Sequence, residues 1–298
     1  MPSPTTYRLL VITPCRDEAR FLPVLIQSVV QQSQRPIAWI LVDDGSRDET
    51  FNLVTQAADQ HPWIKAVRRQ RSGPRQLGPG VVHAFNYGLA AAAVDYDVIA
   101  KLDADLEFGP DCFAAILKHF DDPRVGMASG TTFLKVDGKL VSERYADYHV
   151  PGQAKFYRRE CFAAIGGLQP VYGWDIVDET DARRHGWLTL SDPAIVFIHH
   201  RLQGSSFGAV RGRIIWARGA YAIGSHPLFA LARGIFRMFE RPWLIGGLAF
   251  LWGFFSSYFD PSLQRVQDQE LIHYLRREQL YRLLHGNKLP PPRLKHAQ

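Results

Sequence analysis

The first hundred residues alternate between short apolar runs and longer segments whose apolar residues recur every three or four positions. The apolar runs have the length and the β-branched content of buried strands, and they cover residues 7–14, 37–42, 64–68 and 97–102. Helical periodicity follows in residues 19–32, in the segment that ends near residue 60, and in residues 81–93. This β-α-β-α-β-α-β order with short connections predicts an α/β fold in which helices cover both faces of a mostly parallel sheet.

The next hundred residues continue the alternation less regularly. We predict a helix over residues 110–120, a strand over 125–134 and a hairpin-like turn at 136–139. Further along, the pattern predicts a short helix over 157–165, an aromatic loop at Tyr172-Gly173-Trp174, a helix over 178–185 and a strand that ends at Ile198.

The pattern changes near residue 200, so we expect one α/β domain over residues 1–200 and a basic, apolar, helical region over 201–298. Within that region, residues 226–242 predict an amphipathic helix of the interfacial type, with arginines recurring every fourth position. Residues 242–259 carry no charge, and a helix of that length would reach about 27 Å, only just the thickness of a bilayer core. Because positive residues flank both sides, we expect a re-entrant or in-plane segment rather than a crossing.

Composition and charge narrow the class of protein. The chain has 298 residues, of which 46% are hydrophobic and 21% charged, as in a folded globular protein. Its three cysteines are widely separated and predict neither a disulfide framework nor a zinc site, so we expect a reducing compartment. The N-terminus lacks the features of a signal peptide. Residues 201–241 contain seven arginines and one acid, which matches the net charge of +6 and favours an anionic partner, either lipid head groups or nucleic acid.

Acidic clusters follow three of the predicted strands: Asp17-Glu18, Asp43-Asp44 and Asp103-x-Asp105. The carboxyl ends of parallel strands lie at one edge of a sheet, where ligands bind, so we expect the three clusters to share one crevice. Carboxylate oxygens are the ligands that hard divalent cations prefer, which makes Asp105, with help from Asp103, a candidate metal site. Five basic residues in 65–75 precede Gly78-Pro79-Gly80 and a helix, an arrangement that favours phosphate binding.

Four motifs, in this order and near this spacing, resemble those of the family-2 glycosyltransferases over roughly residues 7–200. They are Pro14-x-x-Asp17-Glu18, Asp43-Asp44-Gly45-Ser46 with Asp48-x-Thr50, Asp103-Ala104-Asp105, and Asp178-Glu179-x-Asp181. The resemblance implies a GT-A fold, a nucleotide-diphosphate sugar as donor, a divalent cation (Mn²⁺ or Mg²⁺) and inversion at the anomeric carbon.

The resemblance also implies a role for each matching residue. Pro14, Glu18, Asp43, Asp44 and Asp103 are expected at the nucleotide, and Asp105, Asp103 and His199 at the metal. The family's acid pair reads Glu-Asp with the second acid as base, whereas this chain has Asp178-Glu179. Position favours Glu179 as the base, with Asp178 as its rival and Asp181 in an orienting role. Tyr172 and Trp174 are candidates to stack on the acceptor sugar.

Several functions remain to be weighed. Residues 199–220 lack the Gln-x-x-Arg-Trp segment of the family's processive synthases, so we expect transfer of a single sugar. The acceptor is expected to be a sugar or lipid-linked hydroxyl, at the cytoplasmic face of an anionic membrane, with the protein peripheral or monotopic. We expect no nucleic-acid partner. The alternatives are a nucleotidyltransferase acting on sugar phosphates, which the glycine-free segment after the first strand disfavours, and a non-catalytic membrane adaptor, which the intact acidic motifs disfavour.

Overall fold

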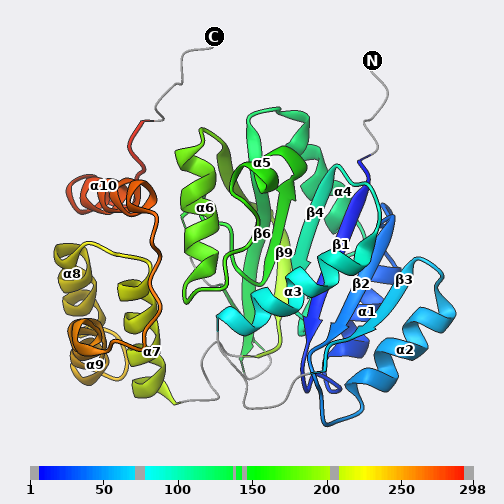
Figure 1. Ribbon diagram of the computed structural model, residues 1–298, viewed down its shortest axis with the longest axis horizontal. Helices are drawn as coiled ribbons and strands as arrows, with labels where there is room; N and C mark the ends of the chain where they lie inside the picture. Colours follow the sequence, from blue (N-terminus) through cyan, green and yellow to red (C-terminus); the bar gives the residue numbers. More distant parts are fainter. Residues whose placement is uncertain (1–6, 71–77, 137–138, 143–145, 202–207, 292–298) are drawn as a thin grey trace. The chain divides into compact units, whose positions relative to one another are not determined.

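The strands of the chain form one mixed sheet. In the computed structural model, residues 7–70, 78–136, 139–142, 146–201 and 208–291 are described, and within them the sheet has nine strands (Figure 1). The strands are β1 (Leu9–Cys15), β2 (Ala38–Asp43), β3 (Ile64–Arg68), β4 (Val98–Leu102), β5 (Leu106–Phe108), β6 (Val125–Val136), β7 (Lys139–Ser142), β8 (Ala154–Arg158) and β9 (Leu188–His199). Their order in the sheet is β3-β2-β1-β4-β8-β6-β9-β5, and β7 pairs with β6.

The N-terminal half of the sheet is parallel, as the sequence predicts. Strand β1 lies between β2 and β4, with Val11 opposite both Trp39 and Ala100. These strands are buried on both faces, which is why they appear as continuous apolar runs rather than alternating ones. Their carboxyl ends therefore meet at one edge of the sheet, where Cys15 lies opposite Asp43.

The second half of the sheet is mixed. Strand β8 is antiparallel to both β4 and β6, β9 is parallel to β6, and β5 is antiparallel to β9. The sequence pattern did not predict β5 or β8. Residues 157–165 were predicted to be one helix, but β8 continues to Arg158, and the helix begins only at Arg159. The strand is short, and its pairing partners lie far away in the sequence, so no local periodicity marks it.

Helices cover both faces of the sheet (Figure 1). Helices α1 (Leu22–Val30), α2 (Thr50–Gln60) and α4 (Cys112–Lys118, followed by the 3₁₀ turn His119–Asp121) pack into a core with apolar side chains of β1, β2 and β4. The opposite face carries α3 (Pro79–Ala92) and α5 (Arg159–Ala164), where Phe85 and Phe162 lie 6.1 Å apart. Helix α3 approaches the sheet so closely that a Cβ on Gly88 would lie 2.6 Å from Val42.

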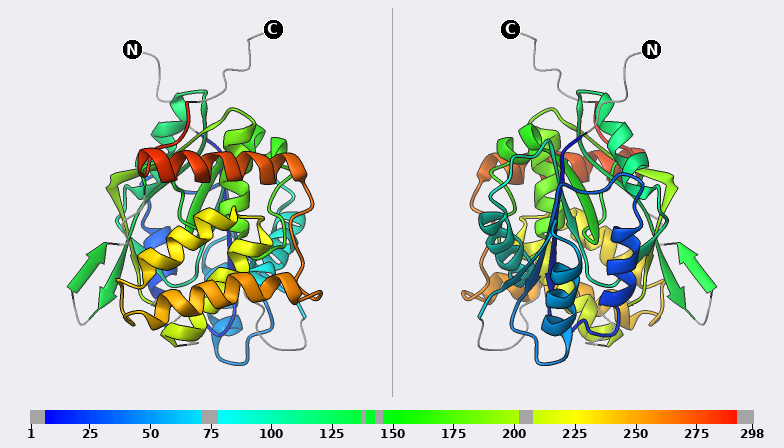
Figure 2. Two further views of the ribbon diagram at one scale, coloured as in Figure 1. Left: turned by 90° about the vertical axis from the view of Figure 1, so that its left-hand side faces the viewer. Right: turned by 90° about the vertical axis from the view of Figure 1, so that its right-hand side faces the viewer.

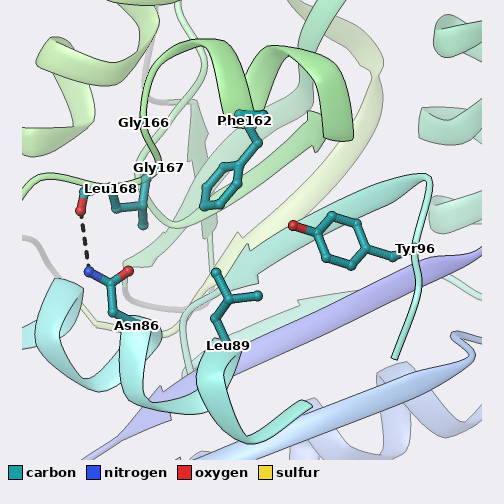
Figure 3. Close-up of a pocket in the computed structure, with 8 residues that line it drawn as sticks. Asn86, Leu89, Tyr96, Phe162, Gly166, Gly167 and Leu168 are labelled. Atoms are coloured by element: carbon teal, nitrogen blue, oxygen red, sulfur yellow. Dashed lines mark hydrogen bonds between the residues drawn. The ribbon is translucent and has the colours of Figure 1, made fainter. Parts of the chain in front are cut away.

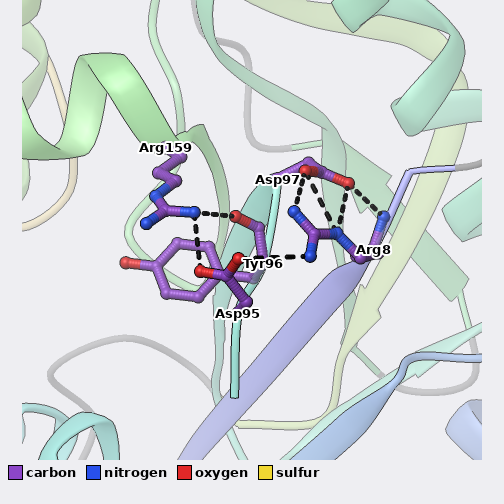
Figure 4. Close-up of polar contacts among 5 residues, drawn as sticks. All are labelled: Arg8, Asp95, Tyr96, Asp97 and Arg159. Carbon is purple, nitrogen blue, oxygen red and sulfur yellow. Dashed lines mark hydrogen bonds and ion pairs between the residues drawn. The ribbon is translucent and has the colours of Figure 1, made fainter. Parts of the chain in front are cut away.

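An ion-pair cluster fastens the amino ends of β1 and β4 (Figure 4). The Arg8 guanidinium donates to the Asp97 carboxylate at 2.7 Å, and Asp97 also accepts from the Arg8 backbone N–H at 2.8 Å. Arg8 and Arg159 both contact Asp95, and Arg159 lies over the Tyr96 ring at 5.7 Å. The cluster therefore holds together three segments that are distant in the sequence.

The remaining helices belong to a second compact unit. The first unit comprises Met1–Gln76, Gly80–Leu168 and Trp187–Arg201, and the second comprises Leu77–Pro79, Gln169–Gly186 and Leu202–Gln298. Residues 169–186, which we expected in the α/β domain, thus belong to the second unit. Its helices are α6 (Trp174–Arg184), α7 (Ala209–Ala222), α8 (Pro227–Arg237), α9 (Ile245–Ser256, followed by the 3₁₀ turn Ser257–Phe259) and α10 (Gln269–His285).

Within the second unit, α9 packs against α7 and α8, and α10 packs against α6 (Figure 2). Helix α7 was not predicted, and the helix predicted over 226–242 ends earlier, at Arg237. The chain then turns before α9. This helix, Ile245–Ser256, covers only the middle of the uncharged segment 242–259. No helix in the described ranges has both the length and the apolar content of a membrane crossing.

Candidate active site

Asp103, Asp105 and His199 lie together at the carboxyl edge of the sheet. Asp103 follows β4, Asp105 precedes β5, and His199 ends β9. The antiparallel pairing of Leu106 with His199 brings the histidine beside Asp105, so that its Nε2 lies 3.3 Å from Asp105 Oδ2. One ligand atom of each residue lies within 4.8 Å of the others. The structure thus brings together the three residues that the sequence predicts at the metal.

Cations from neighbouring positions contact these carboxylates. The Lys101 side chain is only 2% exposed; its ammonium contacts Asp103 and donates to the Gly152 carbonyl at 2.7 Å. Arg201 places its Nε 3.7 Å from Asp105 Oδ2. Burial alone would raise the pKa of Asp105, but the His199 hydrogen bond and the charges of His199 and Arg201 outweigh it and hold that pKa below its ordinary value. Asp105 is therefore ionised at neutral pH.

Arg201 also joins two parts of the site that are far apart in the sequence. Its guanidinium makes two hydrogen bonds with the buried Glu18 carboxylate, one of them at 3.2 Å, and lies over the Phe21 ring at 5.4 Å. Glu18 belongs to the expected nucleotide station, whereas Asp105 belongs to the metal station. One guanidinium therefore lies between the carboxylates of both stations.

The two acids at the end of β2 are paired with two arginines at the end of β3. Asp43 lies opposite Arg68 in the sheet register, and Arg68 Nε is 3.2 Å from Asp43 Oδ2. Arg69 donates to Asp44 Oδ1 at 2.8 Å. We expected these arginines in a phosphate-binding loop, but the structure pairs them with the acids of the nucleotide station. Of the other basic residues of that loop, Lys65 donates to the Ala91 carbonyl, and Arg71 and Arg75 lie outside the described residues.

The loop after β1 is held by side chains of the loop after β2. Asp17 adopts a positive φ of 54°, and its N–H donates to the Ser46 hydroxyl at 3.0 Å. The N–H of Glu18 donates to the Thr50 hydroxyl at 2.7 Å, and that hydroxyl donates in turn to Asp48. The Asp48-x-Thr50 motif thus positions the backbone that carries Glu18.

The thiol of Cys15, at the end of β1, lies among the acids. Burial raises its pKa, and the negative charges of Glu18, Asp43, Asp103 and Asp105 raise it further. Pro14, the preceding residue, lies opposite Val42 in β2. The three acidic clusters after the strands therefore converge on one edge of the first unit, as the sequence predicts.

The acid pair expected to supply the base lies on α6, in the second unit. Asp178, Glu179 and Asp181 are all buried, and Asp178 accepts the Glu179 N–H at 2.6 Å. Glu179 Oε1 lies 3.7 Å from the Arg183 guanidinium, which makes two 2.9 Å hydrogen bonds with Glu278 of α10.

The other residues expected near the acceptor have distinct settings. Asp181 is paired with Arg184 at 2.7 Å and lies 3.2 Å from His185. Trp174 opens α6 and is buried, whereas Tyr172 is half-buried. Between them, Gly173 takes a φ of 72°, a conformation that side chains disfavour. The aromatic loop therefore exposes Tyr172 more than Trp174.

A pocket of about 410 Å³ opens between α3 and α5 (Figure 3). Two of the residues that line it are joined by a hydrogen bond, which Asn86 donates to the Leu168 carbonyl at 3.3 Å. It is lined by Asn86, Leu89, Tyr96, Phe162, Ala163, Gly166, Gly167 and Leu168. These are not the residues that the sequence predicts at the nucleotide, metal or base.

Comparison with known proteins agrees with this geometry. The model of the family "Glycosyl transferase family 2" matches residues 10–174, more than half of the chain. The protein belongs to glycosyltransferase family 2. The matched segment of this family-2 chain contains Pro14, Glu18, the Asp43-Asp44 pair and the Asp103-x-Asp105 motif, whereas α6 beyond Trp174 and His199 lie outside it.

Curated relatives match over part of their length. An uncharacterized glycosyltransferase of Nostoc sp. is 36% identical over 38% of this chain and 33% of its own. The undecaprenyl-phosphate 4-deoxy-4-formamido-L-arabinose transferase of Pectobacterium carotovorum is 32% identical over 37% of this chain and 32% of its own. The aligned part of this family-2 protein thus spans about a third of each of these relatives.

Solved structures match over more of the chain. The mannosyltransferase PcManGT from Pyrobaculum calidifontis, in complex with GDP-Man and Mn²⁺, has a TM-score of 0.58 at 19% identity, covering 86% of this chain and 74% of its own. GalNAc-T7 with UDP, GalNAc and Mn²⁺ has a TM-score of 0.61 at 16% identity, covering 97% and 59%. These likenesses confirm the predicted GT-A-type fold of this family-2 member.

Sequence reasoning identified the acids of the site but not the cations that contact them. The sequence pattern places Lys101 within a predicted strand and Arg201 at the start of the basic region, and it gives neither residue a role in the site. The Asp43–Arg68 contact depends on the register of β2 and β3, which a sequence does not display. An arginine three residues or fewer beyond a predicted strand end is the signal that could have indicated Arg201.

Proposed function

We propose that this protein is an inverting glycosyltransferase that moves a sugar from a nucleotide-diphosphate donor to a hydroxyl acceptor. The observation that supports this most is the Asp103, Asp105 and His199 cluster at the carboxyl edge of a family-2 sheet. Acids from two further strands adjoin it, and each is already neutralised by a neighbouring cation. Such a site has hydrogen-bond acceptors for a nucleoside and oxygen and nitrogen ligands for a cation that accompanies a diphosphate.

The donor set fits a hard divalent cation. Two ligand atoms bound at about 2.1 Å are at most about 4.2 Å apart, so a spread of 4.8 Å needs only a small side-chain adjustment. Two carboxylates and an imidazole suit Mn²⁺ as well as Mg²⁺. When bound, the ion would act as a Lewis acid toward the departing diphosphate. The Mn²⁺ in the Pyrobaculum mannosyltransferase complex supports this proposal.

The chain's own residues would hold the donor and accept a proton. Asp43, Asp44, Glu18 and Pro14 would bind the nucleoside, whose hydroxyl and N–H groups match carboxylate acceptors. In a single displacement, the acceptor oxygen bonds to the anomeric carbon as the bond from that carbon to the diphosphate oxygen breaks. The acceptor's proton passes to a carboxylate, for which we propose Glu179. The Arg183 guanidinium lies 3.7 Å from Glu179 Oε1 and helps to position that carboxylate.

We further propose that the acceptor is lipid-linked and receives a single sugar. The Pectobacterium relative acts, by its name, with undecaprenyl phosphate, which supports a polyprenyl or other lipid carrier. The absence of a Gln-x-x-Arg-Trp sequence in residues 199–220 supports single transfer over processive synthesis. The protein would then work as a peripheral protein at the cytoplasmic face of a membrane.

Thermal shifts with the cation and nucleotide diphosphates test the site directly. A ligand at 100 times its Kd stabilises the folded state by about 2.7 kcal/mol, which raises Tm by about 5 °C. We expect such a shift with Mn²⁺ and either UDP or GDP, and its loss together with transfer activity in Asp105→Asn. Glu107→Gln, an acid two residues further on that contacts His200, is the matched control. An Asp105→Asn protein that keeps both the shift and the activity would exclude the metal assignment.

Separate substitutions identify the base. Glu179→Gln should lower kcat about 10²- to 10⁴-fold while leaving the nucleotide-induced thermal shift in place, because a base contributes to the chemical step and not to donor binding. Asp178→Asn should have a smaller effect on kcat. The reverse ranking would assign the base to Asp178.

A further inference from the structure

The second unit exposes an unusual number of large apolar side chains. Eleven of them fall within the fully described stretch Ile235–Phe259, whereas the described residues of the whole first unit expose seven. The most exposed of these eleven side chains are Phe259 at 88%, Phe239 at 71% and Trp252 at 69%. A concentration of exposed apolar side chains on this scale is typical of an interaction site rather than of an ordinary protein surface.

Helix α9 buries one face, which carries its glycines together with Phe250 and Phe254, and exposes a stripe of other large apolar side chains. A Cβ on Gly247 would lie 2.4 Å from the Gly234 carbonyl of α8, and one on Gly253 would lie 2.8 Å from the Ile214 carbonyl of α7. The outward stripe has helical spacing and consists of Ile245, Leu248, Trp252, Phe255 and Phe259. The glycine side thus faces the unit's interior, and a second apolar stripe faces its surroundings.

Helix α8 also exposes apolar side chains, and it buries an arginine. Arg237, its last residue, faces inward, and the guanidinium lies 5.2 Å from the Trp216 ring and 5.7 Å from the Phe250 ring, whereas Arg233 is exposed. Its exposed apolar stripe consists of Leu228, Leu231 and Ile235, and Phe239 continues the stripe just after the helix. We expected a basic stripe in contact with an interface, but here the arginine is buried and the apolar stripe is outside. In a protein surrounded by water the opposite arrangement is the rule.

We propose that the outward stripes of α8 and α9, with the turn Ser257–Phe259, insert into the interfacial layer of an anionic lipid surface. Helix α9 has 12 residues and is about 18 Å long, well short of the roughly 30 Å of a bilayer core, so it lies in the plane of the surface. Exposed Trp243, Trp252 and Tyr258 are of the residue types enriched at that depth. The proposal rests on the second unit alone and does not depend on the sugar-transfer chemistry.

The charges around the stripes favour anionic lipid over a second copy of the chain. Residues 208–259 contain one acid, Glu240, which already contacts Arg213 at 3.0 Å and Arg237 at 3.3 Å. Arg233 and Arg241 are exposed. Lipid phosphates would complement these arginines, whereas a symmetric contact between two copies would add further arginines of the same sign.

Co-sedimentation of the full chain with vesicles tests the proposal. We expect binding to phosphatidylcholine vesicles that contain about 30% phosphatidylglycerol, and weaker binding to phosphatidylcholine alone and at high salt. Trp252→Ser/Phe259→Ser should reduce affinity for the anionic vesicles about tenfold or more, because both side chains are already exposed in the folded protein. Leu140→Ser/Val141→Ser, a pair of apolar residues on β7 that are 50% and 51% exposed, is the control and should bind like the wild type.

Three results would overturn the proposal. The first is no binding of the wild type, the second is equal binding of the Trp252/Phe259 variant and the control, and the third is a wild-type dimer that this variant converts to a monomer in light scattering. Hydrolysis of the nucleotide-sugar donor in solution should be unchanged in the variant. Loss of vesicle binding with intact hydrolysis therefore supports the lipid surface, and absence of hydrolysis in the wild type would bear only on the proposed function.

Discussion

The buried ion pair between Arg183 of α6 and Glu278 of α10 gives the sharpest prediction about stability. Both side chains are nearly inaccessible, 8% and 4% exposed, and two hydrogen bonds of 2.9 Å join them. Burial lowers the pKa of Arg183, but the charges of Glu179 and Glu278 and the Glu278 hydrogen bonds outweigh it, so the guanidinium stays protonated. Glu278→Leu would take away the bidentate partner and leave a buried charge facing Glu179 at 3.7 Å.

Breaking a buried pair from one side costs about 3–5 kcal/mol, which corresponds to a Tm lowered by roughly 10 °C in a chain of this size. Thermal and urea unfolding monitored by circular dichroism measure this. Glu270→Leu is the control on the same helix, because its contact with Arg184 is exposed and worth less than about 1 kcal/mol. Arg183→Met/Glu278→Leu removes both members of the pair but also takes the guanidinium away from the buried Glu179, so it should recover only part of the loss.

The reasoning would be refuted by a Glu278→Leu loss below about 1 kcal/mol, or by a double variant as unstable as the single one.

Two further predictions concern the first unit. Gly88→Ala should cost about 1–3 kcal/mol in urea unfolding, because its Cβ would lie 2.6 Å from Val42, whereas Gly109→Ala, with nothing within 4 Å, should be nearly neutral; equal costs would contradict the close α3 packing. Asp97→Asn should flatten the loss of stability between about pH 5 and pH 2: hydrogen bonds from Arg8 hold the Asp97 pKa below its ordinary value of 3.8, so the stabilisation is present above 3.8 and is lost as the pH falls from there through the lowered pKa. The effect should be under about 1 kcal/mol because the pair is partly exposed, and a wild type with the same acid sensitivity as the variant would show that the pair contributes nothing.

The sequence pattern predicted the part of the fold that depends on local periodicity. Strands β1, β2 and β4 are buried on both faces and therefore appear as apolar runs, and each ends at or just before an acid of the site. Strand β8 was missed because its five residues include a buried lysine, Lys155, that interrupts the apolar pattern. Helix α7 was missed because arginines and glycines break up its apolar face, and packing against α9 compensates for this only in three dimensions.

The sequence predicted the acids of the candidate site but not the cations that contact them. Asp103 and Asp105 are separated by a single residue in the sequence, and His199 could be added because it ends a strand. Lys101 and Arg201 became part of the site only through the fold, since Arg201 is 183 residues from the Glu18 carboxylate that it contacts. Contacts at such separations depend on strand order, and strand order in the second half of this sheet is not consecutive.

The Thr50 hydroxyl has a consequence for anyone who wishes to change the donor. It accepts the Glu18 N–H and donates to Asp48, so the loop after β1 takes its shape from the loop after β2. The two loops therefore form one structural unit, although Asp17 and its partner Ser46 are 29 positions apart in the sequence. Grafting either loop alone from a relative would leave its partner without the matching hydroxyl or carboxylate. An exchange of nucleotide preference between family members should succeed only when both segments are transplanted together.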